Sequence, residues 1–216
     1  MRTRTRPPEQ QVGRAYVPSM RAAAAVLAML AVPALAEQED FLIDPAHTYP
    51  SFEVSHLGIS TQRGRFNSTK GRIVLDRTAG TGTIEIVIDA SAVSTGNAML
   101  DAVLRSEDFF NVERFPAMTF RAPSVVLEGG VPKRAAGAFT LVGVTRPMEV
   151  SVARFACTRL PFFVRLTCGA DVVASLNRSE FGITAFSLFV GDEVRLLIEV
   201  EAVLQEGAAE PQPAGG

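Results

Sequence analysis

Apolar and polar residues alternate along most of the chain, in short runs that Gly, Pro and small polar residues separate. The first long run covers residues 48–56, where one face carries Pro50, Phe52, Val54 and His56 and the other is mostly polar. Successive side chains of a strand point to opposite faces, so this pattern predicts a strand with one face toward a core or cavity. Such strands are typical of antiparallel sheets whose other face meets water.

Similar runs recur through the rest of the chain. The cleanest is Thr83–Asp89, in which Ile84, Ile86 and Ile88 share one face. Turn-forming residues separate the runs, and one loop is predicted at Gly129, Gly130 and Pro132. Further strands are predicted over a segment that ends at Phe66 and over residues 70–77, 117–121, 124–128, 135–142, 148–155, 170–178 and 193–204. The fold class is therefore all-β, with about eight or nine strands in a barrel or sandwich. A barrel of about eight strands can hold one small ligand.

The period of the pattern changes once, over residues 97–110. There, Leu100, Val103 and Leu104 recur at helical spacing, which predicts one helix inserted between strands. Polar side chains that can cap the start of this helix are Ser94, Thr95 and Asn97.

The first 36 residues have the composition of a cleaved export signal. Five arginines precede the apolar run over residues 22–32, and Ala34-Leu35-Ala36 offers a cleavage site of small residues. The apolar run is too short to span a bilayer, and no Cys follows the cut to carry a lipid anchor. Met20 offers an alternative start to Met1.

We therefore expect one exported domain over residues 37–206, followed by a disordered tail over residues 207–216 that contains only Gly, Ala, Pro, Glu and Gln. Removing the first 36 residues, with their five Arg and one Glu, changes the formal charge from −2 to −6. No cluster of Lys and Arg then remains, which argues against nucleic acid or an anionic membrane surface as the main partner.

Cys157 and Cys168 are the only cysteines. In an exported protein a single pair is most simply a disulfide, and the extended segments around it predict that it joins the strands of a hairpin. Closing a loop of this size stabilises the fold by about 3 kcal/mol in the chain-entropy model. A redox or metal-binding dithiol is the alternative, but the pair lacks C-x-x-C spacing and a nearby His.

Few polar side chains are candidates for chemistry. The chain has no G-x-S-x-G, H-E-x-x-H, P-loop or G-x-G-x-x-G motif, so we expect no catalytic residue and no metal site. With Asp44, the two histidines His47 and His56 could supply three metal ligands, which keeps a metal-dependent enzyme or accessory protein as an alternative. The simpler interpretation places His47 at a turn and His56 at a cavity mouth. Arg178, at a predicted strand end, is expected to hydrogen-bond backbone carbonyls that close the barrel.

The composition includes fourteen Phe against two Tyr and no Trp. Phe carries no polar group, so a cavity lined with it suits a long hydrocarbon better than a hydrogen-bonded metabolite. Small residues on the inward face of strand 170–178, including Ala170 and Ala174, leave room for a lumen. The candidate ligand-binding residues are Phe52, His56, Phe66, Leu100, Phe109, Phe110, Phe120, Phe139, Ala174 and Phe186.

Several short motifs occur in order between Phe41 and Leu204. The first are Asp44-x-x-His47, Phe52-x-x-x-His56-Leu57-Gly58 and Gly64-Arg65-Phe66. The later ones are Ser94-Thr95-Gly96, Leu104-Arg105-Ser106-x-Asp108-Phe109-Phe110, Phe115-Pro116-x-Met118-Thr119-Phe120, Phe139-Thr140-Leu141-x-Gly143-Val144-Thr145-x-Pro147 and Arg178-Ser179-Glu180-Phe181-Gly182. In this order the set resembles the YceI-like, polyisoprenoid-binding family over essentially the whole expected domain.

The resemblance implies a lipocalin-like antiparallel β-barrel of about eight strands with one inserted α-helix, exported to the periplasm. It also implies that the barrel encloses a polyisoprenoid or similar long-chain amphiphile, such as an isoprenoid quinone, for carriage or storage. Neither catalysis nor a further cofactor is implied. We expect a monomer or homodimer without stable membrane insertion. Two alternatives stay open: the metal-dependent protein above, and a periplasmic stress protein that acts through a protein partner.

Overall fold

The computed structural model describes residues 38–159 and 165–205. The strands are β1 (Gln38–Ile43), β2 (Tyr49–His56), β3 (Ser60–Phe66), β4 (Thr69–Asp76), β5 (Thr81–Asp89), β6 (Val93–Ser94), β7 (Ala117–Glu128), β8 (Val131–Leu141), β9 (Val144–Arg159), β10 (Leu166–Asn177) and β11 (Val190–Leu204). The α-helix is α1 (Ala98–Arg105), and two short 3₁₀ helices are η1 (Ala90–Ala92) and η2 (Arg178–Phe181). The expected export signal over residues 1–36 and the expected tail over residues 207–216 lie outside the described residues.

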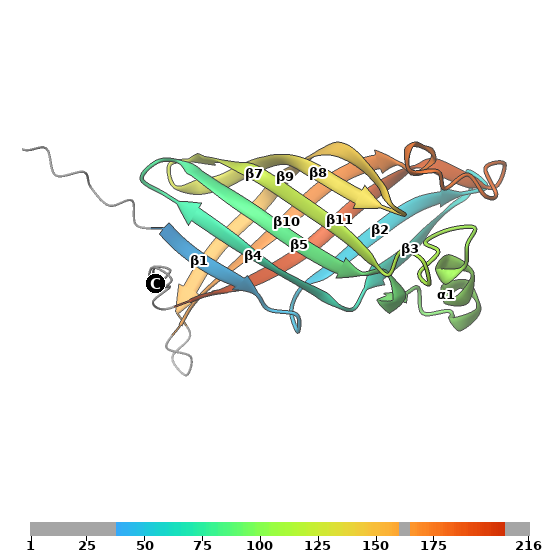
Figure 1. Ribbon diagram of the computed structural model, residues 1–216, viewed down its shortest axis with the longest axis horizontal. Helices are drawn as coiled ribbons and strands as arrows, with labels where there is room; N and C mark the ends of the chain where they lie inside the picture. The colour runs from blue at the N-terminus through green and yellow to red at the C-terminus, as the bar shows by residue number, and fades with distance from the viewer. Residues whose placement is uncertain (1–37, 160–164, 206–216) are drawn as a thin grey trace, which may run out of the picture. The chain divides into compact units, whose positions relative to one another are not determined.

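Antiparallel pairing closes the strands into a barrel (Figure 1). The ring runs β1–β4–β5–β7–β8–β9–β10–β11 and returns to β1, where residues 41–43 pair with residues 202–204. β2 occupies the same strand position as β1, β3 the same as β4, and β6 the same as β5, with a short break in the chain between the two members of each pair. This follows because β2 pairs with β11 and β3, and β3 pairs with β6. The barrel therefore has eight strand positions, and the predicted antiparallel barrel with one inserted α-helix is confirmed.

Alternation along the strands decides which side chains face the interior, as predicted. In β2, Pro50 and Phe52 are buried whereas Ser55 is exposed. In β5, Ile88 belongs to the buried core, and Ile84 and Ile86 pack against it. The apolar face of each strand thus lies inside the barrel.

The break between β1 and β2 is held by side-chain hydrogen bonds. Asp44 Oδ1 accepts from the N–H of Ala46 at 2.9 Å, and Asp44 Oδ2 lies 2.8 Å from Nδ1 of His47, which places His47 at a turn as predicted. Thr48 is 1% exposed; its hydroxyl donates to the carbonyl of Glu201 at 3.1 Å and accepts from the N–H of Glu201 at 3.0 Å. At the break between β1 and β2, the Thr48 hydroxyl bonds the backbone of Glu201 in place of a backbone group, so β11 can pair with both β1 and β2.

The predicted helix is present but shorter than expected. Asn97 caps it, because its Oδ1 accepts from two helical N–H groups at 3.0 and 3.3 Å. The helix ends at Arg105, since Ser106 adopts an extended conformation and its hydroxyl donates to the carbonyl of Val103 at 2.7 Å. Residues 106–110, predicted as helical, therefore form a bend and turns. Within the described ranges, no helix is long and apolar enough to cross a membrane.

The two strands predicted over residues 117–121 and 124–128 are a single strand, β7. Pro123 has no N–H to donate, so a proline inside a strand needs an irregular position. A register shift against β8 between Arg121 and Ser124 provides that position. The proline that suggested a break between two strands therefore marks a bulge within one strand.

Two further differences concern strand ends. Gly129 and Gly130, both with positive φ, form the turn between β7 and β8, whereas Pro132 lies inside β8 rather than in a loop. The sequence pattern does not predict β1, whose first three residues are polar. β1 is a strand because β4 and β11 pair with its two edges.

Cys157 and Cys168 form the predicted disulfide, with an S–S distance of 2.04 Å. The two residues are direct cross-strand partners in β9 and β10, with their Cα atoms 4.0 Å apart. The bond therefore joins the two strands of a hairpin, as expected, near the connection that lies outside the described residues.

Candidate functional site

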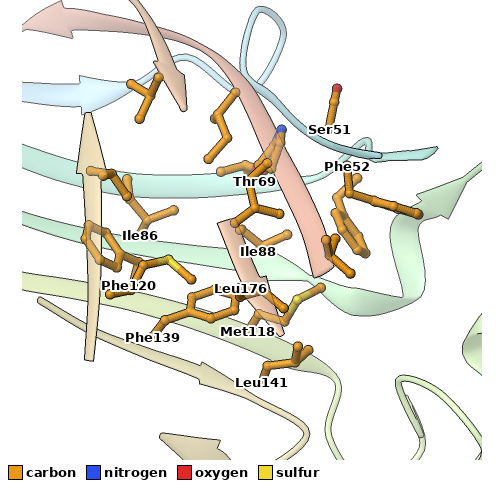
Figure 2. Close-up of a pocket in the computed structure, with 18 of the residues that line it drawn as sticks. Ser51, Phe52, Thr69, Ile86, Ile88, Met118, Phe120, Phe139, Leu141 and Leu176 are labelled. Carbon is orange, nitrogen blue, oxygen red and sulfur yellow. The ribbon is translucent and has the colours of Figure 1, made fainter. Parts of the chain in front are cut away.

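The interior of the barrel contains an apolar cavity. Its volume is about 780 Å³, within the range of about 300–1,000 Å³ that is usual for small-molecule sites. In Figure 2, Ile86, Phe120, Phe139 and Leu176 from four different strands turn toward the same space. Interiors of proteins normally pack without such space, so the cavity is a candidate binding site.

Nine of the ten candidate ligand-binding residues line this cavity: Phe52, His56, Phe66, Leu100, Phe109, Phe110, Phe120, Phe139 and Phe186. They come from β2, β3, β7, β8, α1 and the segments that follow α1 and η2. The fold thus brings residues from the whole domain into one wall. Their contact with a ligand remains a prediction.

Ala174 is the exception. Its neighbours at the same face of β10, Val172 and Leu176, line the cavity, but Ala174 does not. It packs against the core cluster and faces Leu196 of β11 across the strand pair, and Leu196 does line the cavity. Ala174 also lines a separate polar hollow with Glu149 and Arg195, so the structure does not bring it to the cavity wall. Gly169 and Ala170 are the small residues of β10 that line the cavity.

Several wall residues were missed by the sequence analysis. Phe41 of β1 and Phe189 of the segment before β11 both line the cavity. Phe41 belongs to a strand that was not predicted, and Phe189 belongs to an irregular segment without periodicity. By contrast, Ile86 and Ile88 of β5 could have been added, because their strong alternation already placed them on the inward face.

Aromatic contacts attach the α1 segment to the barrel. The ring of Phe66 lies 5.8 Å from that of Phe52 and 5.5 Å from that of Phe110, measured between centroids, in tilted arrangements. Phe109 stacks on Phe186 at 6.0 Å. Such pairs are favourable beyond their burial alone. They hold the segment after α1 against β2, β3 and the segment before β11, where half-exposed Phe186 also lines the cavity.

Arg134 of β8 lines the cavity wall nearer the opposite end, but five polar residues lie together at the α1 end of the barrel. They are His56 at the end of β2, Gln62 and Arg63 of β3, and Thr95 and Asn97 before α1. His56, which was predicted at a cavity mouth, belongs to this group. An apolar wall with polar groups at one end can bind an amphiphile, with its chain inside and its polar head at the mouth.

Thr69 of β4 is another polar residue of the cavity wall (Figure 2). The residue is 3% exposed, and its Oγ1 has no hydrogen-bond partner among the described residues. Thr48, the other buried threonine of the wall, is satisfied by Glu201 as described above. A buried hydroxyl without a partner is unfavourable, so Thr69 Oγ1 is a polar group with which a ligand in the cavity can form a hydrogen bond.

Arg178 holds the loop before β11 in place. This residue is 5% exposed, and its guanidinium donates to four backbone carbonyls, two in the segment between η2 and β11 and two at the start of β11. Nη1 donates to Ile183 and Ala185 at 3.1 and 2.8 Å, Nη2 donates to Val190 at 3.0 Å, and Nε donates to Gly191 at 2.9 Å. The expected role of Arg178 in binding carbonyls is confirmed, and it fixes the loop that carries Phe186 and Phe189.

The two histidines lie far apart. His47 precedes β2 and His56 ends it, and eight residues at roughly 3.3 Å each separate the strand's ends by roughly 25 Å. One metal ion cannot bind both, so geometry excludes a single centre that uses His47 and His56. His47 instead lies near Asp44 and Glu201, at 2.8 and 4.0 Å, on an exposed surface. Its hydrogen bond with Asp44 raises the pKa of His47 and lowers the pKa of Asp44.

Comparison with known proteins gives consistent matches. The family model described as the YceI-like domain matches residues 41–202. A UPF0312 protein of Shewanella denitrificans is 36% identical over 126 residues, which cover 57% of this chain and 66% of that protein. The chain therefore spans slightly less than two thirds of this relative's length.

Two solved structures share the fold. BcnA of Burkholderia cenocepacia matches with a TM-score of 0.61 at 21% identity, over 74% of this chain and 98% of BcnA. A polyisoprenoid-binding domain of Saccharophagus degradans, implicated in plant cell wall breakdown, matches with a TM-score of 0.54 at 14% identity, over 76% of this chain and 98% of that domain. At these identities the matches show a common barrel.

Proposed function

The chain belongs to the YceI-like domain family, and from this premise we propose that its barrel binds a polyisoprenoid or a similar long-chain amphiphilic lipid, such as an isoprenoid quinone. The observation that carries the proposal is the apolar cavity of about 780 Å³ with its Phe-rich wall. The fold shared with a polyisoprenoid-binding domain supports the same class of ligand. The protein acts as a carrier or store and not as an enzyme.

The energetics suit reversible carriage. Each methylene that moves from water into an apolar site contributes about 0.8 kcal/mol, so a long isoprenoid chain strongly prefers the cavity to water. The competing environment in a cell is the bilayer, whose hydrocarbon is as apolar as leucine side chains. Transfer between bilayer and cavity is therefore close to balance, as a carrier requires.

The wall also suggests how the ligand lies. Its polar residues, such as Gln62, Thr95 and Asn97, are at the α1 end, whereas Leu75, Phe155 and Ala202 line the wall near the opposite ends of their strands. A polar head can hydrogen-bond at the mouth while the chain extends into the barrel. The ligand therefore enters by its chain, with the head left at the α1 end.

We place this function outside the cytoplasm, in the periplasm. The Cys157–Cys168 disulfide supports this location, because such bonds persist in oxidising compartments. The Arg-rich, apolar segment over residues 1–36 supports export as a cleaved signal.

Uptake of an added quinone tests the function. Protein stripped of lipid in detergent is mixed with a long-chain isoprenoid quinone, separated by gel filtration, and assayed by quinone absorbance. The matched control is a quinone with the same head and no isoprenoid chain. We expect retention of about one long-chain quinone per chain and none of the control, because burial of the chain drives binding. Equal retention of both compounds, or of neither by folded protein, would refute the proposal.

A further inference from the structure

Large apolar side chains that are exposed gather at one end of the barrel. Seven of the eight such residues among the described ones lie there, and Leu42 of β1 is the eighth. We call these seven the apolar rim: Leu57, Ile59, Met99, Val103, Phe186, Leu188 and Phe189. Their exposed fractions reach 83% at Ile59 and 88% at Leu188. Single exposed apolar residues are ordinary, but a contiguous group marks an interaction surface.

Three separate segments build the apolar rim. They are the turn between β2 and β3, the outer face of α1, and the loop before β11, which lie at the same end of the barrel in Figure 1. The N–H of Leu57 donates to the carbonyl of Phe189 at 2.7 Å, so the turn and the loop are joined. Stacking of Phe109 on Phe186 joins the loop to the segment after α1. On α1, Met99 and Val103 are four residues apart and share a face.

The apolar rim is continuous with the cavity. Val103, Phe186 and Phe189 line the cavity and are also 42%, 53% and 51% exposed. These side chains therefore connect the interior wall to the outer surface, beside the polar residues of the α1 end. A hydrocarbon chain that leaves the cavity meets the apolar rim first.

We propose that the apolar rim docks on the surface of a lipid bilayer, with the cavity mouth against the membrane. The proposal rests on the carrier function proposed above and names the partner with which the carrier exchanges its ligand. Passage through water would expose every methylene of the ligand, whereas a docked mouth transfers the chain from one apolar phase to another. A second copy seated mouth to mouth would bury the same side chains but would close the route to the bilayer.

The charges near the apolar rim indicate that attraction is hydrophobic. The tips Leu57–Ile59 and Phe186–Phe189 contain no charged residue. Asp101 binds the hydroxyl of Thr95 at 2.7 Å, and Asp192 binds that of Ser179 at 2.7 Å. Glu107 and Asp108, next to Phe109, are exposed acidic residues, which disfavour contact with anionic lipid. Docking therefore needs no anionic lipid, and salt, which screens surface charges, leaves it unchanged.

Flotation with vesicles of neutral phosphatidylcholine tests the docking. The test variant is Ile59→Ser with Leu188→Ser, which changes the two most exposed residues of the apolar rim, neither of which lines the cavity. The matched control is Leu42→Ser, an exposed apolar residue on β1. We expect the parent and the control to float with the vesicles at low and high salt. The rim variant should partition at least about tenfold less, because each change removes a large apolar side chain from the membrane contact.

The uptake assay with the long-chain quinone runs in parallel on the same proteins, in detergent and without vesicles. Normal quinone uptake by the rim variant, together with lost flotation, supports docking as a property separate from binding. A parent that retains quinone but does not float, or a rim variant that floats as the parent does, overturns the docking alone. A parent that floats without retaining quinone overturns the carrier function. A parent dimer that the rim variant dissociates, without flotation, shows a second copy on the apolar rim and also overturns docking.

Discussion

The guanidinium of Arg178 provides a perturbation whose cost can be worked out from the structure. It is 5% exposed and donates four hydrogen bonds of 2.8–3.1 Å to backbone carbonyls between Ile183 and Gly191. Changing Arg178→Ala removes all four donors at once. The loop that carries Phe186 and Phe189 then loses its main attachment to the barrel.

The expected loss follows from the groups left behind. A buried polar group without a partner costs about 1–3 kcal/mol, and bonds to charged donors are worth about 1.5–3 kcal/mol. Removal of the guanidinium also relieves the cost of burying a charge, so the four terms do not add in full. Water can reach the three carbonyls whose bonds with Arg178 are only partly buried. We therefore expect Arg178→Ala to lower the free energy of unfolding by about 3–5 kcal/mol.

Urea unfolding, followed by circular dichroism, measures this loss as a shift of the transition midpoint. The matched control is Arg146→Ala, because Arg146 is exposed and donates one bond of 3.2 Å to the carbonyl of Glu180 in the neighbouring η2. We expect a change below about 0.5 kcal/mol for this control. Amide hydrogen exchange should rise in residues 182–190 of the Arg178 variant, and less elsewhere. A loss below about 1 kcal/mol for Arg178→Ala would refute the reasoning, since it would mean that the carbonyls need no donor.

Three further predictions use the same domain. Replacing Cys157 and Cys168 together by Ser should lower the free energy of unfolding by about 3 kcal/mol, and the intact protein should show no thiol to alkylation under denaturing conditions; one reactive thiol per chain would contradict the pairing. Ala170→Phe places a ring in the cavity, so the melting temperature should change little and quinone uptake should fall. The same change in a filled core would cost about 1–3 kcal/mol of stability. A much lower melting temperature with normal uptake would show that Ala170 faces packed protein. Because its bond with Asp44 raises the pKa of His47, the pair's small stabilisation is present at lower pH and is lost as pH rises through that raised pKa. NMR titration should give His47 a higher midpoint than it has in Asp44→Asn, and equal midpoints would contradict the pair.

The interior faces of the strands could be predicted because a period of two needs only the sequence. Alternation in β2 and β5 identified inward residues such as Phe52 and Ile88, and both are buried in the barrel. Helix capping is equally local, and Asn97 was among the candidates for it. The disulfide could be predicted because exported proteins form disulfides and the chain has a single pair of cysteines.

Features that depend on distant partners could not be predicted in this way. β1 has a polar start and is a strand because β4 and β11 pair with it, so Phe41 was missed. Alternation groups Ala174 with Val172 and Leu176, but whether a side chain reaches the cavity depends on how the barrel closes around it, and Ala174 does not line the cavity. For Arg178 the kind of acceptor was predictable, whereas the carbonyls themselves come from a loop whose path is set by tertiary contacts. The apolar rim joins three segments, and no single stretch of sequence marks it.

The central claim is that the cavity encloses a long-chain lipid, and native mass spectrometry of protein purified from the cell envelope tests it most directly. The account predicts that each folded chain carries one additional mass that is lost on gentle activation, and that solvent extraction identifies this mass as a long-chain isoprenoid lipid. The same preparation of Ala170→Phe should carry less of it, because the ring occupies part of the cavity wall. Well-folded parent protein that carries no long-chain lipid, and that takes up no added quinone, would contradict the account.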